Sequence, residues 1–255
     1  MMNNFGWLKE LPDFRDFLGL PERVLALLAD KSPPKKVDMR DQCSAIHDQG
    51  NIGSCVAQSV VSAVEFLDRK IDGSYSDMSR LMLYYEARKM IGTVNSDSGC
   101  YIRDGIKLIN NLGVCRESLW PYDPSRFKEM PYPVCYLEAP EHKTLSYYRV
   151  TTLAEIKQAL TAGLPVVFGI SIYESFMNPT IKMTGYITMP TITESLIGGH
   201  AIYACGYDDV QKVIIFPNSW GDQWGENGIG YLPYEYFDVG LCNDMWVITT
   251  LNYNN

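Results

Sequence analysis

Apolar residues recur at helical spacing over residues 56–70, a segment without internal glycine or proline. Val56 and Val60 fall on one face of this helix, and polar residues accumulate toward its end. We therefore predict a long buried helix. The same spacing predicts two shorter helices further along the chain, at 79–91 and 103–112.

The pattern changes after a proline-rich crossover at 120–140, which is expected to be irregular. One more helix is predicted at 152–160. The apolar segments beyond it are short, rich in β-branched or aromatic residues and bounded by turns, which is typical of strands. The predicted strands are Leu164–Ile172, His200–Ala204, Lys212–Phe216 and Met245–Thr250. The chain is thus expected to have a mainly helical lobe at about 37–140 and a mainly β lobe at about 141–255.

Residues 1–36 mix charged residues with prolines and end in the linker-like sequence Lys-Ser-Pro-Pro-Lys-Lys. We interpret them as a short leader before a domain at 37–255. The leader holds more apolar residues than a solvated tail would: Phe5, Trp7, Leu8, Leu11, Phe14, Phe17, Leu18, Leu20, Val24, Leu25 and Leu27. We expect them to be buried, either over a cleft, where the leader would keep a zymogen inactive, or on the lobes as a permanent stabilising arm.

Composition narrows the class of protein. The chain has 255 residues, 46% of them hydrophobic and 20% charged, as in soluble globular proteins. Its net charge of −8 leaves no basic surface for a phosphate backbone, so nucleic acid is not an expected partner. No apolar stretch approaches the roughly 20 residues that cross a bilayer, and the N-terminus has neither secretory nor transit features. We expect a monomer that binds no membrane, whose location (cytoplasmic, non-classically exported or virion-packaged) stays open.

Seven cysteines and three histidines are the candidates for thiol or metal chemistry. The cysteines form no Cys-x-x-Cys pair, so a thiolate zinc site is poorly supported. Their odd number leaves at least one thiol free in any set of disulfides, and the sequence does not choose among the pairings.

Cys55 follows a small-residue loop, residues 48–54, and opens the long predicted helix. A thiol in the first turn of a helix lies near unpaired backbone N–H groups, which favour the thiolate. The loop glycines allow a substrate to approach closely, and Gln49 would project an amide toward the spot to which the Cys55 N–H points, forming an oxyanion hole. The alternative is a structural core cysteine, since free cysteines are usually buried.

A thiolate nucleophile needs a histidine partner. His200 begins a predicted strand after two glycines, and Asn218 follows the next strand in a segment rich in tryptophan and glycine. An asparagine there could accept a hydrogen bond from the imidazole and orient it. His47 has no orienting strand or asparagine, and His142 has no supporting motif. We therefore predict that Cys55, His200 and Asn218 act together.

Three segments carry a resemblance to a known family: Gln49–Cys55, Gly199–Ile202 and Asn218–Gly228. Over about residues 39–255 the chain resembles the papain-like cysteine peptidases, in particular their compact bacterial and large-virus members. The resemblance implies an α+β fold of two lobes, the second an antiparallel β-barrel-like unit. The active site would lie in the cleft between the lobes.

The resemblance also implies a reaction. It points to an endopeptidase that hydrolyses peptides or proteins through a thioester acyl-enzyme, without a metal or organic cofactor. In the family's pattern Cys55 is the nucleophile, Gln49 helps to bind the oxyanion, His200 transfers protons and Asn218 orients the imidazole. Two alternatives stay open: another acyl transfer on the same residues, such as transamidation or deamidation, and a non-catalytic peptide-binding module.

Four further residues are implied to bind substrate. Ser98 and Gly99 stand where family members hold the substrate backbone. Gly199 stands at the wall of a specificity subsite, and Trp220 where a tryptophan covers the histidine–asparagine bond. The chain departs from the family at Ile52, which replaces a cysteine three residues before the nucleophile, so the usual disulfide cannot form.

Overall fold

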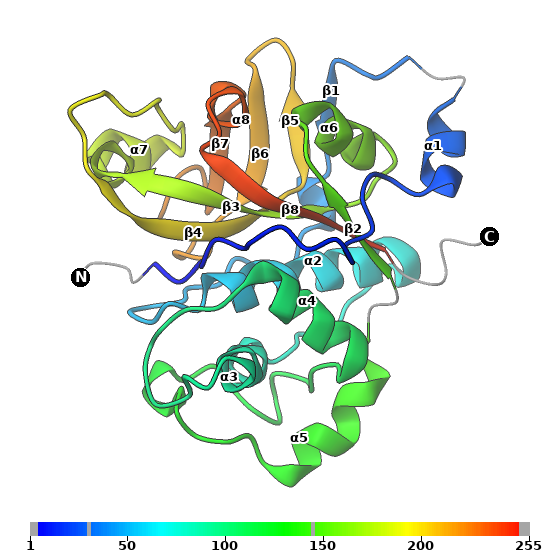
Figure 1. Cartoon of the computed structure of the whole chain (residues 1–255), viewed down its shortest axis with the longest axis vertical. Coiled ribbons are helices and arrows are strands. Elements are labelled where there is room, and N and C mark those ends of the chain that lie inside the picture. Colours follow the sequence, from blue (N-terminus) through cyan, green and yellow to red (C-terminus); the bar gives the residue numbers. More distant parts are fainter. Residues whose placement is uncertain (1–4, 30–31, 144–145, 250–255) are drawn as a thin grey trace.

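The first lobe consists of helices that pack against one long central helix. The computed structural model describes residues 5–29, 32–143 and 146–249 (Figure 1). The helices of this lobe are α2 (Cys55–Asp72), α3 (Arg80–Met90), α4 (Ile102–Asn111) and α5 (Pro133–Glu138). The apolar face of α2 packs against α3 and α4 on one side and against strand β4 of the second lobe on the other.

The three helices predicted for this lobe are confirmed within a few residues, and local chemistry explains their ends. The Ser79 side chain accepts a hydrogen bond from the backbone of Met82 and caps α3. Gly73, at a φ of 73°, ends α2 in the left-handed conformation. The crossover at 120–140 is not irregular throughout, because α5 begins at Pro133, where proline fits the first helical turn.

The second lobe consists of two four-stranded antiparallel sheets. One has the order β1 (Lys36–Asp38), β5 (Gly206–Asp208), β6 (Val213–Pro217) and β7 (Ile229–Pro233). The other has the order β2 (Ser146–Val150), β8 (Cys242–Thr249), β3 (Val166–Tyr173) and β4 (Leu196–Ala204). The four predicted strands are β3, β4, β6 and β8, and the predicted end of the last, Thr250, lies outside the described residues.

The expected α+β fold of two lobes with an antiparallel second lobe is confirmed, but the sheets of this lobe do not form a closed barrel. The chain passes from β4 through Cys205 into β5, so the two sheets meet at a corner. Within the described residues no pairing closes the outer strands into a ring. Strands β1 and β5 are three residues long, too short to carry the hydrogen bonding around a closed barrel.

The remaining α-helices of the described residues are short: α1 (Glu22–Leu28), α6 (Leu153–Thr161), α7 (Pro179–Thr184) and α8 (Glu235–Asp238). Helix α6 is the one predicted at 152–160, and Thr152 and Glu155 form a capping box at its start. No helix among the described residues has the length and apolar character needed to cross a membrane.

Strand β1 changes the predicted lobe boundary. Lys36–Asp38, expected at the junction of the leader and the helical lobe, pairs with Gly206–Asp208 of β5 in the second lobe. A strand of the β lobe, β1, therefore precedes the helices of the helical lobe in the sequence. Lys31, in the predicted linker, lies outside the described residues.

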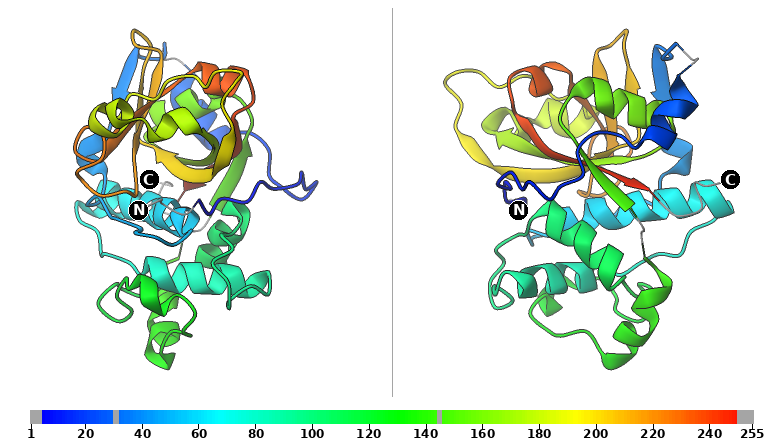
Figure 2. Two further views of the ribbon diagram at one scale, coloured as in Figure 1. Left: turned by 90° about the vertical axis from the view of Figure 1, so that its left-hand side faces the viewer. Right: turned by 45° about the vertical axis from the view of Figure 1, so that its right-hand side comes forward.

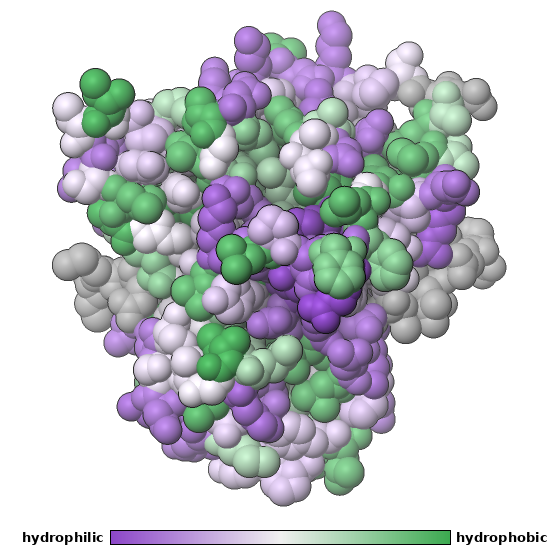
Figure 3. All heavy atoms as spheres, in the orientation of Figure 1, coloured by the Kyte–Doolittle hydropathy of each residue, from purple (hydrophilic) through white to green (hydrophobic). Residues whose placement is uncertain are grey.

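The leader runs across the face of the molecule between the two lobes (Figure 1). Part of it projects as a loop, seen in the left view of Figure 2. Trp7, Leu20 and Val24 are buried. The expected burial is wrong for most of the other apolar residues of the leader. Those that are exposed are Leu11, Phe14, Phe17, Leu18, Leu25 and Leu27. Figure 3 shows apolar side chains along this face.

Candidate active site

Cys55 is the first residue of α2, at the place where the two lobes meet. The loop before it turns at Gly50, which has a φ of 64°, and is held at Gly53, whose N–H donates to Asp97 Oδ1 at 2.9 Å. The Cys55 side chain is fully buried. The thiol thus lies at the start of a helix, as the sequence predicts.

His200 and Asn218 come from the second lobe, and their side chains meet. His200 lies on β4, Asn218 directly follows β6, and Nε2 of the histidine is 2.8 Å from Oδ1 of the asparagine. The Trp220 ring lies 4.8 Å from the imidazole between centroids, and Trp224 packs edge-on against Trp220 at 5.7 Å. The tryptophans therefore cover the histidine side of the site.

Gln49 is fully buried at the junction of the lobes. Its Nε2 donates to the carbonyl of Ile52 at 2.9 Å, and its Oε1 accepts from the Ser219 hydroxyl at 2.7 Å. The amide nitrogen therefore faces the loop that leads to Cys55, where an oxyanion donor is required. The Tyr122 hydroxyl donates to the Gln49 carbonyl at 2.9 Å and braces this loop from the helical lobe.

The surroundings keep Cys55 and His200 uncharged while the leader is in place. Burial raises the pKa of the Cys55 thiol to about 11, although backbone hydrogen bonds from Ala201 and Gly6 oppose the rise. Burial lowers the pKa of His200 to about 4, against a smaller opposing effect of its bond to Asn218. At neutral pH the site therefore holds a thiol and a neutral imidazole, rather than the ion pair that a reactive cysteine needs.

The leader pairs with the backbone of both lobes at this site. On one side the Trp7 N–H donates to the carbonyl of Gly199 at 3.1 Å. On the other side Cys100 donates to the carbonyl of Gly6 at 2.9 Å and accepts from the N–H of Leu8 at 3.1 Å. This is a parallel bridge between Trp7 and Cys100. Gly6 thus turns its N–H toward the Cys55 thiol and its carbonyl toward the Cys100 N–H.

The two residues expected to hold substrate backbone lie just before this bridge. Gly99 has a φ of 71°, and a Cβ there would lie 2.1 Å from the Gly6 carbonyl oxygen. Ser98 pairs through its hydroxyl with Thr93 at 2.7 Å. In this structure it is the next residue, Cys100, that makes the backbone bonds.

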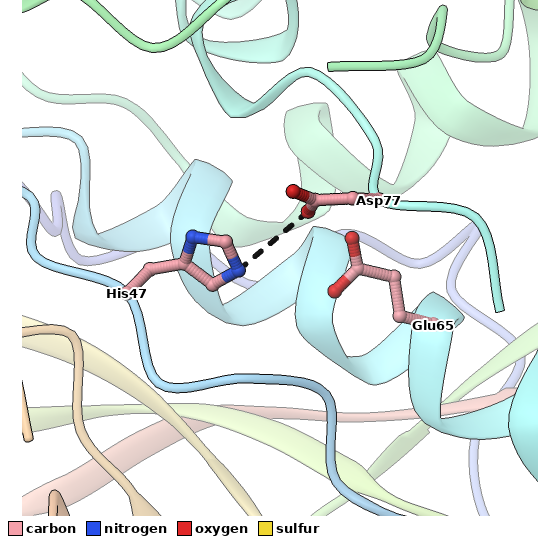
Figure 4. A group of neighbouring side chains, drawn as sticks. All are labelled: His47, Glu65 and Asp77. Atoms are coloured by element: carbon pink, nitrogen blue, oxygen red, sulfur yellow. Dashed lines mark ion pairs between the residues drawn. The ribbon is translucent and has the colours of Figure 1, made fainter. Parts of the chain in front are cut away.

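The described residues contain one group of potential metal ligands close to this region: His47, Glu65 and Asp77, with ligand atoms within 4.8 Å of one another (Figure 4). Arg80 already occupies the carboxylates, at 2.6 Å from Glu65 and 2.9 Å from Asp77. Burial, followed by the positive charge of Arg80, lowers the pKa of His47 to about 4, against the opposing effect of Asp77. A cation of the chain itself, Arg80, therefore already pairs with both carboxylates of this group.

Sequence reasoning missed Cys100, Tyr122 and the role of Asp244, whose carboxylate accepts a hydrogen bond from the Trp7 indole. The residues that these three contact lie far from them in the sequence, so no local sequence motif indicates them. All seven cysteines are buried as free thiols, and only Cys55 opens a helix at the junction of the lobes.

Comparison with known proteins agrees with this geometry. The family described as papain family cysteine protease matches residues 33–244. The chain is 38% identical to a peptidase C1-like protein of Acanthamoeba polyphaga mimivirus, over 96% of this chain and 86% of that protein. It is 28% identical to cysteine proteinase 1 of Entamoeba histolytica, over 86% of this chain and 70% of that protein.

Among solved structures, a cysteine protease of Xylella fastidiosa, xylellain, superposes with a TM-score of 0.88 at 35% identity. The match covers 98% of this chain and 97% of xylellain, so it extends over the leader as well as the domain. Relatives named as proteases do not favour the alternatives of a non-catalytic module or a different acyl transferase.

Proposed function

Because the chain belongs to the papain family of cysteine proteases, we propose that Cys55, His200, Asn218 and Gln49 carry its peptide hydrolysis and that the leader holds this site inactive. Cys55 passes its proton to His200, and the sulfur attacks the substrate carbonyl carbon. The Cys55 N–H and the Gln49 amide hold the oxyanion. Asn218 keeps the imidazole facing the sulfur.

The tetrahedral intermediate then loses its amine, which takes the proton from His200, and a thioester on Cys55 remains. His200 removes a proton from a water molecule, whose oxygen attacks the thioester carbonyl. Collapse of this second intermediate releases the carboxylic acid, and the sulfur recovers its proton. No step needs a group beyond these side chains, the substrate and water. We further propose that internal bonds of polypeptides are cut, since the leader itself runs past Cys55, from the Phe5 ring, 6.3 Å from the Trp220 ring, to Trp7, which pairs with Cys100.

The leader acts in two parts. The plug, residues 5–10, covers Cys55 and fills the backbone positions that a substrate would use. The arm, residues 16–28, is held on the second lobe, where Gly19 donates to the carbonyl of Arg149 at 2.8 Å and the Arg149 N–H donates to Phe17 at 2.8 Å. Val24 is buried, and α1 packs on α6. The zymogen and stabilising-arm hypotheses therefore apply to different stretches of the same segment.

The contact between Gly6 and Gly53 carries this proposal. A Cβ on Gly6 would lie 1.7 Å from the Gly53 carbonyl oxygen, next to the nucleophile. Only glycine fits here, so the plug is shaped to this cleft. The domain side of the contact is held by the bond of Gly53 to Asp97, so a side chain on Gly6 is expected to displace the plug rather than this loop.

The test compares full-length Gly6→Ala with Phe14→Ala, whose side chain is 98% exposed in the same leader. Gly6→Ala should raise hydrolysis of a fluorogenic peptide by about tenfold or more, because a clash of this kind opposes docking. Phe14→Ala should leave the rate unchanged. A peptidyl epoxide should label Cys55 in Gly6→Ala, and adding Cys55→Ala should abolish both labelling and hydrolysis, while Cys205→Ala should not. Equal rates for the two leader variants would refute the plug, and hydrolysis without Cys55 would refute the mechanism.

A further inference from the structure

The peptide group that joins Ile52 and Gly53 lies just before the nucleophile and is bonded at both of its edges. Its N–H donates to Asp97, at 2.9 Å to Oδ1 and 3.1 Å to Oδ2. Its carbonyl accepts from Gln49 Nε2 at 2.9 Å. The N–H and the C=O of a trans peptide point in opposite directions, so Asp97 and Gln49 approach this planar group from opposite sides. A tilt of the plane at one edge therefore moves the acceptor at the other.

Asp97 is itself held by helix α3. The Tyr84 hydroxyl donates to Asp97 Oδ1 and accepts from the Gly99 N–H at 3.3 Å. Burial, followed by the bond to Asp97, raises the pKa of Tyr84, so this hydroxyl keeps the proton that it donates. The Arg88 guanidinium lies 4.1 Å from the centroid of the Tyr84 ring and donates to the carbonyl of Val94 at 2.8 Å. The carboxylate is thus supported from the helical lobe.

These bonds of Asp97 lie within the domain. Gly53 belongs to the loop before Cys55 and Tyr84 belongs to α3, so the departure of the plug removes neither partner. Gly53 follows Ile52, where the chain lacks the cysteine of the family's usual disulfide. A carboxylate binds an N–H more strongly than a neutral acceptor does. Asp97 therefore ties the loop of the nucleophile to the segment before α4 by a hydrogen bond.

We propose that Asp97 is a positioning residue for the reaction, which acts through the peptide group of Ile52 and Gly53 to set the direction of the Gln49 amide. This inference rests on the proposed peptidase function. Ser219 fixes the oxygen end of this amide, and the Ile52 carbonyl fixes its nitrogen end. The bond to Ile52 uses one hydrogen of the nitrogen and so sets where the second one points, toward the oxyanion. Such a donor stabilises the oxyanion only if it is in position before the charge develops.

The first test is a double-mutant cycle on peptide hydrolysis, in the full-length Gly6→Ala chain. Asp97→Ala should lower kcat by about tenfold or more and change KM by less than about threefold, because a misdirected donor weakens transition-state binding. In Gln49→Ala there is no amide left to direct. The same change at Asp97 should then lower kcat by at most about twofold further. An equal fold loss with and without Gln49 would overturn the proposal.

Conservative variants keep this test independent of a general loss of folding. Asp97→Asn keeps an acceptor oxygen without the charge and should recover part of kcat. Tyr84→Phe removes the hydroxyl behind Asp97 but leaves the carboxylate for Gly53, so its loss should be smaller than that of Asp97→Ala. Asp104→Ala, which removes a carboxylate of α4, is the control and should keep the kcat of the parent. A loss in Asp97→Asn as large as in Asp97→Ala would contradict the role of the acceptor oxygen.

The direction of the Gln49 amide can also be measured without turnover. In NMR spectra of the full-length chain, the side-chain NH2 signals of Gln49 are identified by their loss in Gln49→Ala. They should shift by more than a linewidth in Asp97→Ala, less in Asp97→Asn, and stay in place in Asp104→Ala.

This measurement separates the inference from the proposed function. Shifted Gln49 signals in Asp97→Ala, with no peptide hydrolysis even in the Gly6→Ala parent, would support the positioning role and refute the peptidase. Hydrolysis by the parent, with Gln49 signals that do not move in Asp97→Ala, would support the peptidase and refute the positioning role.

Discussion

The Nε2 atom of His200 and the Oδ1 atom of Asn218 lie 2.8 Å apart, and the N–H of Ser219 donates to the same oxygen at 2.9 Å. The backbone donor fixes which end of the asparagine amide faces the ring. A neutral imidazole can then only donate from Nε2, which leaves Nδ1 as the proton-accepting nitrogen of the ring.

Asn218→Ala should lower kcat by about a hundredfold, because the imidazole loses its orientation while the nucleophile and base remain. His200→Ala should be more severe and nearly as low as Cys55→Ala, since nucleophile and base act as one unit. Steady-state kinetics in the Gly6→Ala background measure all three. An Asn218→Ala chain as inactive as Cys55→Ala would mean that the asparagine does more than orient the ring.

Gln49→Ala should lower kcat by about 10²–10³ with little change in KM, the usual cost of one lost oxyanion donor. Ser219→Ala is the matched control, because it removes the bond to Gln49 Oε1 and leaves the amide nitrogen in place. Its loss of kcat should be smaller. A rise in KM at constant kcat for Gln49→Ala would assign the residue to substrate binding instead.

The Cys55 thiol should react slowly with iodoacetamide in the full-length chain until the pH approaches 11, since burial under the plug holds its pKa at about 11. In Gly6→Ala solvent reaches the sulfur, and the alkylation rate should level off at a lower pH. Mass spectrometry of the Cys55 peptide follows this one thiol among the seven. Superimposable pH profiles would show that the plug does not control the thiol.

Glu10 makes the docking of the plug depend on pH. Burial, followed by the charge of Asp244, raises the pKa of Glu10 to about 7, against the opposing effects of Arg103 and Arg149. The docked state therefore binds a proton that the free leader, with a pKa near 4.5, has released. Docking is then strongest below about pH 4.5 and weakens as the pH rises to about 7.

Glu10→Gln should remove this part of the pH dependence. We expect the Tm of the parent chain to fall between pH 4.5 and 7 relative to the Tm of Glu10→Gln. Glu22→Gln, also in the leader but at the start of α1, is the control and should follow the parent. If the difference in Tm between the parent chain and Glu10→Gln is constant over this pH range, Glu10 is not the group that makes docking depend on pH.

Glu65→Ala should destabilise the chain by about 3–5 kcal/mol, because Arg80 would be left buried without its partner. Both side chains are fully buried, 2.6 Å apart. Asp77→Ala removes a half-exposed partner of the same arginine and should cost about 1 kcal/mol or less. Urea unfolding measures both. Equal losses of unfolding free energy would show that the buried ion pair contributes no more than the half-exposed one.

The parts of the fold that could be predicted are those whose information is local. The periodicity of 56–70 specifies α2, because one face of a helix must be buried. Cys55, His200 and Asn218 could be found because each has its own signal: a glycine-rich helix start, a strand after two glycines and a tryptophan-rich turn. The structure joins His200 and Asn218 by a hydrogen bond, and Cys55 lies on the helix that packs against β4, the strand of His200.

The rest depends on contacts between distant residues. The Trp7 ring packs on glycines of two strands, Gly169 and Gly199, and bonds to Asp244 in an irregular stretch of β8, and none of these residues forms a motif alone. The exposure of Phe14 could not be foreseen either. A hydrophobic residue count indicates that a segment packs, but it does not say which residues form the projecting loop.

Strand β1 also sets a limit on how far the chain can be shortened. It is the outer strand of its sheet and covers β5 along Gly206–Asp208. A form that begins beyond Asp38 would leave the N–H and C=O groups of β5 as a bare edge, ready to pair with a second chain. Such a form should aggregate even though its catalytic residues are intact, whereas processing that stops before Lys36 leaves the edge protected.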